Sequence, residues 1–328
     1  MSLLVFSAGS RISQGLTKHL HATGNFDKIV CADVFPGYST YERYFRFKDQ
    51  LDQNSKTQVT EAKIFQRSEL TNLFKEATHV VYCTHDHYKV VPAKDNLLKL
   101  TSELTAAHAN IQKTVFVTPT EYDNYQEPDT IDASIKSEQN ALATAGDKSL
   151  LIRSDLTFGP FSQLVHNTLL AKVLSGSSIA FAGHSGRRNP ISVNDLAKMV
   201  ENGLASSETG RAFYAKGAKD YSYAEIIGLF EQMSAKKANV NQDALQKVFS
   251  PLSANVVSEM LYTECYQNCM RIMDNKRDHE PSGYGDASEL LGEGVIMEAF
   301  ETFYGKAYFE SLGGAGPAKK GWVEKVLY

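Results

Sequence analysis

The residues that follow the first apolar run could bind a ligand that carries phosphate groups. Residues 3–6 are predicted to form a buried strand and residues 12–21 a helix, so a short loop leads directly into a helix N-terminus. A helix N-terminus favours an anion, and serine hydroxyls in the loop can hydrogen-bond one. The candidate binding residues of this loop are Ser7, Ser10, Arg11 and Ile12.

An acidic residue after the second predicted strand fits the same kind of ligand. Asp33 ends the apolar run at residues 28–32 and lies 20 residues after Ser13. That is close to the spacing at which a carboxylate meets a ribose hydroxyl of a bound dinucleotide. A turn acid that faces solvent at a strand end would look the same in sequence, so both interpretations stay open.

These side chains need a parallel sheet to position them. Apolar, strand-sized runs alternate with helix-like stretches, and near-continuous apolar strands are typical of a parallel sheet covered on both faces. The sequence therefore predicts an α/β fold, a Rossmann-type doubly wound parallel sheet with a smaller C-terminal α/β region. The predicted strands lie at residues 3–6, 28–32, 78–83, 114–118 and 149–153, and the helices between them at 12–21, 68–77, 93–110 and 131–145.

The pattern changes after about residue 160, where strands become shorter and helices dominate. We predict three parts with approximate boundaries. They are a Rossmann nucleotide-binding-like domain at residues 1–160, a smaller α/β lobe interleaved with it at 161–275, and a C-terminal helix and extended tail at 276–328. The last helix is expected at about residues 293–308.

Composition excludes several classes of protein. The 328 residues are enough to bury a core without disulfides or metals, and a net charge of -4 argues against a nucleic-acid footprint. Four cysteines are too few for a disulfide scaffold, and no apolar run reaches the roughly 18–20 residues of a transmembrane helix. A first strand at residue 3 leaves no room for a targeting peptide, although a processed chain would look the same. His79, His85, Asp86 and His87 resemble a metal cluster, but only a structure would show a third ligand, and solvated polar residues of a loop are the favoured interpretation, so no metal site is predicted.

Three later passages resemble a known family. Residues 151–160 carry an arginine, Arg153, followed after a short spacer by Gly-Pro. Residues 183–197 combine a glycine-containing basic turn with a "valine, x, Asp, hydrophobic, Ala" helix start, and residues 210–227 continue the likeness. Taken with the opening strand, turn and helix, the order of these passages resembles the extended short-chain dehydrogenases, the NAD-dependent epimerase-like family, over about residues 1–235.

The cofactor loop departs from that family. The resemblance implies a Gly-x-x-Gly-x-x-Gly loop, but Ser7, Ser10 and Ser13 stand at the three glycine positions. A serine at a position that needs a positive φ costs roughly 1–2 kcal/mol, and the Ser10 side chain would occupy space where phosphate oxygens sit. We therefore expect NAD(P) binding through Ser7, Ser10, Arg11, Ile12, Asp33 and Lys136 to be weak or structural.

The catalytic residues that the resemblance implies are also incomplete. The family uses Tyr-x-x-x-Lys in the helix before the Arg153 strand, with tyrosine as acid–base and lysine lowering its pKa. Lys136 stands where that lysine should be, but Asp132 occupies the tyrosine position, and an ionised carboxylate cannot replace a phenol. The family's Ser/Thr corresponds to Thr118 or Thr120. Lys136 and Thr118 are thus expected to be remnants, and no catalytic residue is assigned with them.

Three functions remain open. The first is a non-catalytic accessory or structural subunit of a larger assembly, because the chain is similar to the dehydrogenase-like accessory subunit of mitochondrial complex I. That similarity implies protein partners, membrane association only through them, and a mitochondrial rather than a cytoplasmic location. The alternative is an active NAD(P)-dependent epimerase or reductase with an unusual active site. A nucleotide sensor without chemistry is the third.

Overall fold

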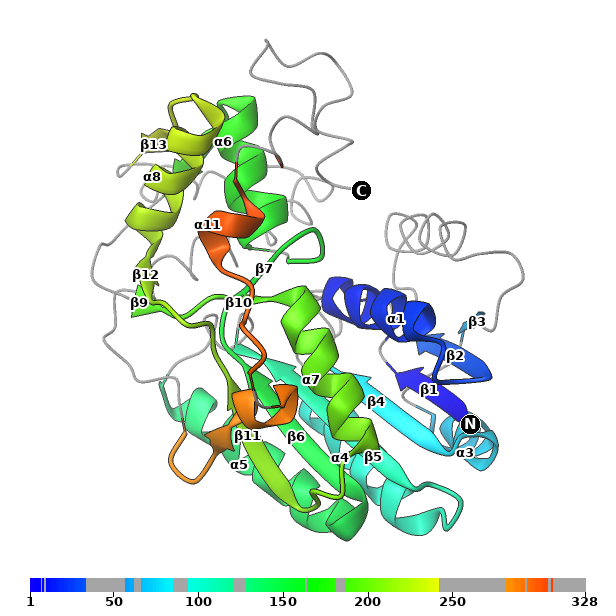
Figure 1. Ribbon diagram of the computed structural model, residues 1–328. Helices are drawn as coiled ribbons and strands as arrows, with labels where there is room; N and C mark the ends of the chain where they lie inside the picture. Colours follow the sequence, from blue (N-terminus) through cyan, green and yellow to red (C-terminus); the bar gives the residue numbers. More distant parts are fainter. Residues whose placement is uncertain are drawn as a thin grey trace, which may run out of the picture.

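The structure is a computed structural model, and it shows a large sheet with a smaller lobe beside it (Figure 1). It describes residues 1–6, 8, 10–33, 57–61, 66–84, 94–120, 128–162, 164–180, 187–241, 281–292, 294–305 and 308.

Eight parallel strands form the large sheet, in the order β14-β11-β6-β5-β4-β1-β2-β3. From β1 the chain adds β2 and β3 on one side and then returns past β1 to add β4 on the other. The predicted doubly wound Rossmann-type sheet is therefore confirmed. The strands are β1 (Ser2–Phe6), β2 (Lys28–Asp33), β3 (Thr57–Glu61), β4 (His79–Cys83), β5 (Lys113–Pro119), β6 (Ser149–Ser154), β11 (Arg211–Ala215) and β14 (Gly285–Asp286).

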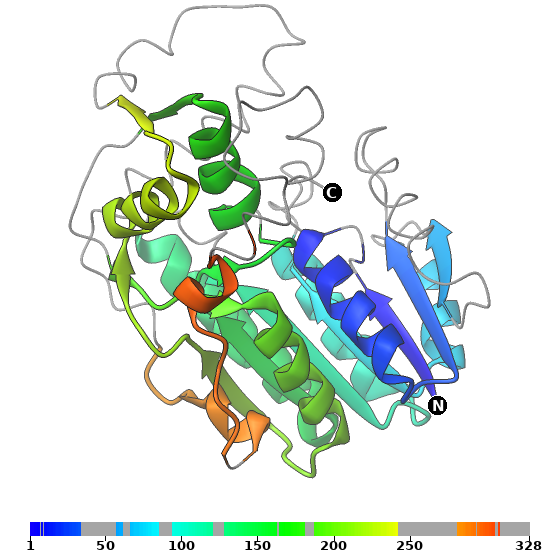
Figure 2. The same ribbon diagram turned by 45° about the horizontal axis from the view of Figure 1, so that its top comes forward.

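Helices cover both faces of this sheet. On one face, α1 (Arg11–Thr23) and α7 (Val193–Ala205) lie side by side, as Figure 2 shows. Their apolar side chains pack on alternate strand residues such as Val5 and Val81. On the other face, α3 (Arg67–Glu76), α4 (Lys94–Ala107) and α5 (Pro128–Ala145) pack on the intervening residues such as Phe6 and Tyr82. This alternation explains why the strands read as continuous apolar runs.

The smaller lobe has its own apolar core, formed by Phe158, Phe230, Phe300 and Tyr304 with their neighbours. Residues after 160 also return to the large sheet, because α7, β11 and β14 belong to it. The predicted boundaries at residues 160 and 275 stay predictions, and residue 275 lies outside the described part. The short helix η5 (Ala287–Leu291) packs on α7 and on β11 of the large sheet. The remaining elements are β7 (Thr157–Phe158), the π-helix η4 (Val165–Leu170), α6 (Ala171–Ser175), β8 (Ser178–Ala180), β9 (Arg187–Arg188), β10 (Ile191–Ser192), β12 (Tyr221–Ser222), α8 (Tyr223–Ser234), β13 (Asn239–Asn241) and α11 (Phe300–Phe303).

The predicted C-terminal helix at residues 293–308 is wrong in extent. Among the described residues of this range, α11 and Tyr308 are helical, whereas residues 294–299 before α11 form no helix. Gly292 and Gly294 adopt φ values of 86° and 77°, outside the helical region. The backbone N–H of Glu298 donates to the Asp195 carboxylate at 2.6 Å, so this segment is bonded to α7 rather than to itself.

Candidate functional site

β1 and β4 are neighbours in the sheet, but the chain leaves β1 toward β2 on one side and later continues from β4 on the other side. The carboxyl ends of these two strands therefore mark the switch point of the sheet. In open α/β sheets, ligands bind in the crevice at such a switch point. Ser10 and Cys83 lie at this point, and the hydroxyl of Ser10 approaches the Cys83 sulfur at 3.8 Å. Ser7 lies outside the described residues. The crevice is therefore the place to test the predicted cofactor residues.

Ser10 caps the helix that faces this crevice. Its backbone is extended (φ -67°, ψ 148°), and its hydroxyl accepts a hydrogen bond from the Ser13 N–H at 3.1 Å. The strain expected for a serine at this position is therefore absent, because no positive φ is needed. The side chain is also fully buried instead of protruding into the crevice. It serves as a helix cap where the family has glycine.

The first turn of α1 retains backbone groups suited to an anion. The helical ladder begins with Gln14 N–H donating to the Ser10 carbonyl at 3.0 Å. The N–H groups of Arg11 and Ile12 precede that ladder, so they belong to the set that a helix N-terminus offers to a ligand. A dinucleotide phosphate fits this end of α1, with one amide fewer than a glycine loop would offer because Ser10 occupies Ser13 N–H.

Sequence reasoning missed a glycine inside α1. A Cβ atom at Gly15 would lie 2.6 Å from Val193 and 3.0 Å from Phe161, so no side chain fits there. Gly15 thus lets α1 approach α7 and the segment after β7 closely. The family's third glycine serves this kind of close packing. A lone glycine in an otherwise amphipathic helix was the available signal.

Asp33 lies at the carboxyl end of β2 and is fully buried. The interpretation as a solvent-facing turn acid is therefore wrong. Its register partner on the neighbouring strand is Glu61, so two acidic residues end adjacent strands. This is the side of the crevice at which an adenosine ribose would lie if a phosphate sat at α1.

An ion pair sets which face of α5 points inward. Glu138 and Arg153 are both buried, with the Arg153 Nη1 and Glu138 Oε1 atoms 2.5 Å apart. The Tyr284 hydroxyl donates to the other Glu138 oxygen at 3.0 Å. Ser134, four residues before Glu138, is buried on the same side. The inward face of this helix therefore presents a serine and a paired glutamate.

Lys136 and Asp132 are exposed instead. Lys136 is two residues from Glu138, which places the two side chains about 200° apart around the helix. The structure does not bring Lys136 together with Ser10 or Asp33. The sequence of α5 also contains no tyrosine. The usual Tyr–Lys pair is absent from this helix by sequence and by orientation.

The two threonines at the end of β5, Thr118 and Thr120, differ in their hydrogen bonds. The Thr120 hydroxyl accepts a hydrogen bond from Arg188. Thr118 is 6% exposed, and its hydroxyl has no hydrogen-bond partner among the described residues. Its register partner is Arg153, next to the α5 ion pair. Thr118 is therefore the hydroxyl at this strand end that has no hydrogen-bond partner among the described residues.

A buried ion pair joins the sheet to the smaller lobe. The Arg188 Nε donates to Asp155 Oδ1 at 2.6 Å, and the Asn189 N–H donates to Asp155 Oδ2 at 3.0 Å. Burial opposes the charge on Arg188, but the Asp155 carboxylate outweighs it and raises the arginine pKa. Burial, and next the Asp155 charge, raise the pKa of Tyr214, so its phenol stays protonated.

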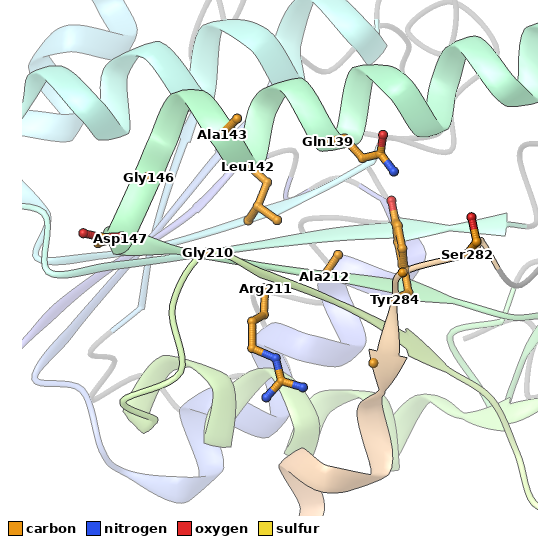
Figure 3. Close-up of a pocket in the computed structure, with 12 residues that line it drawn as sticks. Gln139, Leu142, Ala143, Gly146, Asp147, Gly210, Arg211, Ala212, Ser282 and Tyr284 are labelled. Carbon is orange, nitrogen blue, oxygen red and sulfur yellow. The ribbon is translucent and has the colours of Figure 1, made fainter.

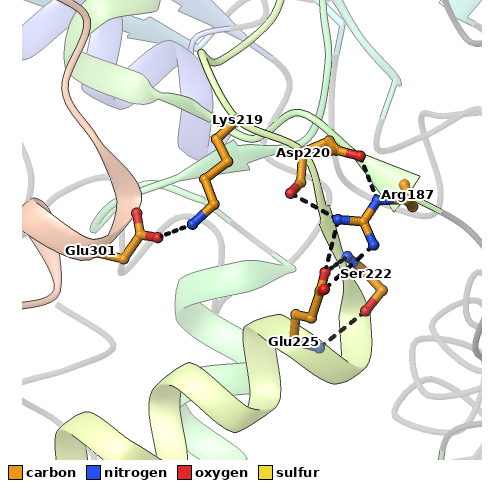
Figure 4. A network of polar contacts seen from close by, with 6 residues as sticks. All are labelled: Arg187, Lys219, Asp220, Ser222, Glu225 and Glu301. Carbon is orange, nitrogen blue, oxygen red and sulfur yellow. Dashed lines mark hydrogen bonds and ion pairs between the residues drawn. The ribbon is translucent and has the colours of Figure 1, made fainter.

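An exposed polar network continues this junction on the outside (Figure 4). Arg187 pairs with Asp220 and, at 3.1 Å, with Glu225 at the start of α8. Lys219 pairs with Glu301 of α11 at 2.7 Å. The hydrogen bonds that Arg187 donates to Asp220 and Glu225 raise the pKa of its guanidinium, so the arginine stays charged at neutral pH.

A cavity of about 640 Å³ lies between the C-terminal half of α5, the start of β11 and residues 282–285 (Figure 3). Tyr284 and Gln139 form one wall, and the start of β11 at Arg211 forms another. Three strands, β5, β6 and β4, separate β11 from β1. This cavity is therefore separate from the crevice at the end of β1.

The chain shares its fold with enzymes that bind nicotinamide cofactors. A dTDP-glucose 4,6-dehydratase from Bacillus anthracis in complex with NAD aligns with a TM-score of 0.67 and 13% identity, over 95% of this chain and 97% of that one. A nucleoside-diphosphate-sugar epimerase from Staphylococcus aureus aligns at 0.62 and 14%, over 93% and 99%. A triphenylmethane reductase from Citrobacter sp. complexed with NADP(H) aligns at 0.62 and 14%, over 92% and 99%. At these identities the likeness establishes the fold alone.

No family model matches the sequence, and no curated protein is similar to it. Within the part of the chain that the structure describes, no helix combines the length and apolar character needed to cross a membrane. The same residues contain no group of three or more His, Cys, Asp or Glu side chains placed to hold a metal. His85 and His87 lie outside them.

Proposed function

We propose that this chain binds a nicotinamide dinucleotide at the carboxyl ends of β1, β2 and β4, and that it is an NAD(P)-dependent epimerase or reductase with an unusual active site. The observation that carries the proposal is the Ser10-capped end of α1 at the switch point, with the buried Asp33 beside it. The shared fold of the NAD- and NADP(H)-bound enzymes supports it.

Different residues bind the phosphates and the ribose of the dinucleotide. The Arg11 and Ile12 amides receive the phosphates at the helix N-terminus, and the Arg11 side chain adds positive charge there. Asp33 accepts hydrogen bonds from the ribose hydroxyls. The carboxylate of Asp33 also disfavours the extra phosphate of NADP, so NAD is the expected form.

Substrate chemistry takes place near the end of β5. A bound nicotinamide supplies hydride exchange with a carbon of the substrate. Thr118 holds the substrate oxygen by donating its hydroxyl hydrogen, and no buried tyrosine of α5 is present to exchange a proton with that oxygen. The chain therefore orients the substrate strongly but provides no phenol acid–base from this helix.

Titration calorimetry with NAD, NADH, NADP and NADPH tests the binding part. NAD or NADH should bind, NADP more weakly, and Asp33→Asn should reduce the affinity about 10- to 100-fold, since hydrogen bonds to a charged group contribute about 1.5–3 kcal/mol. Lys136→Ala is the matched control and should bind like the wild type, because Lys136 is exposed. If no dinucleotide binds, or if Lys136→Ala abolishes binding, the assignment is incorrect.

Turnover is tested separately. The wild type and Thr118→Val are mixed with a panel of nucleoside-diphosphate sugars and either NAD or NADH. Oxidation of NADH by a reductase is followed by absorbance, and epimerised sugar, which forms with no net change of the nicotinamide, is detected by chromatography. The wild type should convert at least one substrate of the panel, and Thr118→Val should lose most of that rate while still binding NAD. Binding without any turnover would favour the second candidate.

The second candidate is a non-catalytic, dinucleotide-holding accessory subunit. The inward face of α5 favours it, because Ser134 and the paired Glu138 stand where a catalytic helix needs a tyrosine and a lysine. On this hypothesis the chain is a partner-bound mitochondrial protein of a complex I-like assembly. Native electrophoresis of gently solubilised cells distinguishes the two: migration with a large membrane assembly supports the subunit, and migration as a free monomer or dimer contradicts it.

A further inference from the structure

A second cavity lies at the opposite edge of the sheet from the crevice, where the strands begin. It encloses about 590 Å³ between the C-terminal ends of α1 and α7 and the first residues of β4 and β5. Phe26 and Leu204 form apolar wall, and His79 and Lys113 extend from the sheet. Cavities of this size bind small organic molecules. Nothing in the proposed dinucleotide site uses this edge.

Hydrogen bonds around Thr78 fix the position of the proton on His79. The Thr78 hydroxyl has a single hydrogen, which it donates to the Ser2 carbonyl at 2.9 Å. It must therefore accept from the His79 Nδ1–H, 3.0 Å away. Burial, and next the charges of the N-terminal amine and Lys113, lower the pKa of His79, so the ring is neutral at neutral pH. In this tautomer Nε2 is an acceptor.

That acceptor has no protein partner. The ring of His79 is 6% exposed, and no residue in the described part of the chain hydrogen-bonds its Nε2. The ring of His79 also meets the ring of Phe26 edge-on, with the two centroids 5.6 Å apart. Nε2 is not one of the fully buried unpartnered atoms of the described residues, so it is open to the cavity and can accept a hydrogen bond from a ligand there.

Lys113 provides a donor beside this acceptor. Lys113 and His79 are register partners on neighbouring strands, so their side chains leave the sheet on the same face. Lys113 is 4% exposed, and its ammonium donates to the carbonyls of Ser206, at 3.2 Å, and Glu208. An ammonium has three hydrogens, and no described residue accepts the third.

The charges around the cavity favour a neutral ligand. Glu201 contributes a carboxylate, hydrogen-bonded by His19 at 2.7 Å and Asn25 at 2.5 Å. The C-terminal ends of α1 and α7 add partial negative charge. The ammonium of Lys113 is hydrogen-bonded by the carbonyls of Ser206 and Glu208, and the N-terminal amine of Met1, which also lines the cavity, is paired with Asp27. Two cations thus stand against two carboxylates, so the site has no net charge that would favour an ionic ligand.

We propose that this cavity binds a small neutral ring with an amide edge, that is, an N–H beside a C=O, as in a lactam or a pyrimidine. The ring N–H donates to His79 Nε2, and the ring carbonyl accepts from Lys113. Neighbouring strands lie about 4.8 Å apart, which lets both side chains reach one such edge. The apolar body of the ring packs on Phe26 and Leu204.

A matched pair of probe ligands tests the proposal. 2-Pyridone carries the amide edge, and N-methyl-2-pyridone has nearly the same shape but lacks the N–H. Each is titrated into the full chain with ¹⁵N-labelled histidine, and the His79 Nε2 resonance is followed by NMR. 2-Pyridone should shift this resonance with saturation, and the N-methyl compound should bind about tenfold more weakly, as expected for one lost hydrogen bond.

Two variants and one direct contact complete the test. His79→Phe should lose the preference for 2-pyridone, while His108→Phe, on the other face of the sheet beside Phe74, should keep it. In the wild type, ligand protons should give nuclear Overhauser contacts to the Phe26 ring. Equal binding of the two probes, an unchanged preference in a folded His79→Phe protein, or the absence of Phe26 contacts would overturn the proposal. Because the resonance belongs to His79, dinucleotide binding at the crevice neither mimics nor masks the result.

Discussion

Arg187 and Arg188 are neighbours in sequence and differ in their surroundings. Arg188 is buried and paired with Asp155, whereas Arg187 is exposed and paired with Asp220 and Glu225. Removing one partner of a buried pair leaves a charge without compensation, while exposed pairs are screened by water. The two positions therefore form a matched comparison within a single strand, β9.

Arg188→Met should lower the free energy of unfolding by about 3–5 kcal/mol, because Asp155 stays buried with its charge unpaired. Urea unfolding followed by circular dichroism measures this loss. Arg187→Met is the control and should change the midpoint far less. An equal effect of the two substitutions would show that the Arg188–Asp155 pair does not join the lobes as described.

His79 should give the protein a dependence of stability on pH. Burial lowers its pKa below the ordinary value near 6.5, so the unfolded chain binds more protons than the folded chain just below that pH. The His79 contribution is complete above pH 6.5 and is lost as the pH falls from 6.5 toward the folded-state pKa. Urea midpoints measured from pH 7 to 5 should fall for the wild type, and less steeply for His79→Phe.

The pKa of His108 is also lowered, by burial and then by Lys75 and Lys148, but its side chain is more exposed than that of His79. His108→Phe should therefore flatten the same curve less than His79→Phe does. A slope between pH 7 and 5 that is unaffected by His79→Phe would contradict the placement of this ring in a buried site.

At the scale of elements, the end of α1 determines how tightly a phosphate is held. Ser10→Gly removes the hydroxyl that occupies the Ser13 N–H and costs the cap only a few tenths of a kcal/mol. That amide then becomes an additional donor to the phosphate, so NAD should bind about tenfold more tightly. Calorimetry measures the affinity, and thermal unfolding checks that α1 is intact. Weaker binding would mean that the serine hydroxyl itself contacts the phosphate.

Strands whose side chains are apolar on both faces were predictable. Residues 3–6 and 114–118 became β1 and β5, because each is packed between two helical layers. β3 was missed, since four of the five residues of Thr57–Glu61 (TQVTE) are polar and the strand lies at the edge of the sheet. β14 was missed because two residues, Gly285 and Asp286, carry no pattern of their own. Edge strands are defined by their neighbour and not by their composition.

The same distinction explains the candidate site. Asp33 was predictable, because a strand end and a fixed spacing define it. The orientation of α5 was not, since one position of drift turns a helical side chain by about 100°. The contact that decides the orientation joins Glu138 to Arg153, 15 residues away on another element. The spacing in the sequence predicted that Lys136 faces the cofactor. In the structure, the ion pair of Glu138 with Arg153 fixes the orientation of α5, and Lys136 lies on its exposed side.

At the scale of the whole molecule, the C-terminal segment joins the large sheet to the smaller lobe. At the sheet, the Glu298 carboxylate accepts from the Ser192 hydroxyl, at 2.5 Å, at the start of α7. In the lobe, the Tyr304 hydroxyl accepts from the Gly159 N–H and is hydrogen-bonded to His166 Nδ1, both at 3.0 Å. The segment is thus bonded to both parts at buried or partly buried sites, and we expect them to unfold together.

Tyr304→Phe should weaken that coupling. Without the Tyr304 hydroxyl, the buried Gly159 N–H and one nitrogen of His166 lose a hydrogen-bond partner. An unsatisfied buried group lowers the free energy of unfolding by about 1–3 kcal/mol. Because the lost bonds lie in the lobe, hydrogen exchange should increase first in η4 and α11 while β1 and β5 stay protected. Tyr221→Phe removes a hydroxyl that donates to the partly exposed Glu301 and should have the smaller effect. Exchange that rises uniformly over both parts would show that the lobe and the sheet unfold as one unit even without this hydroxyl, and that other contacts hold them together.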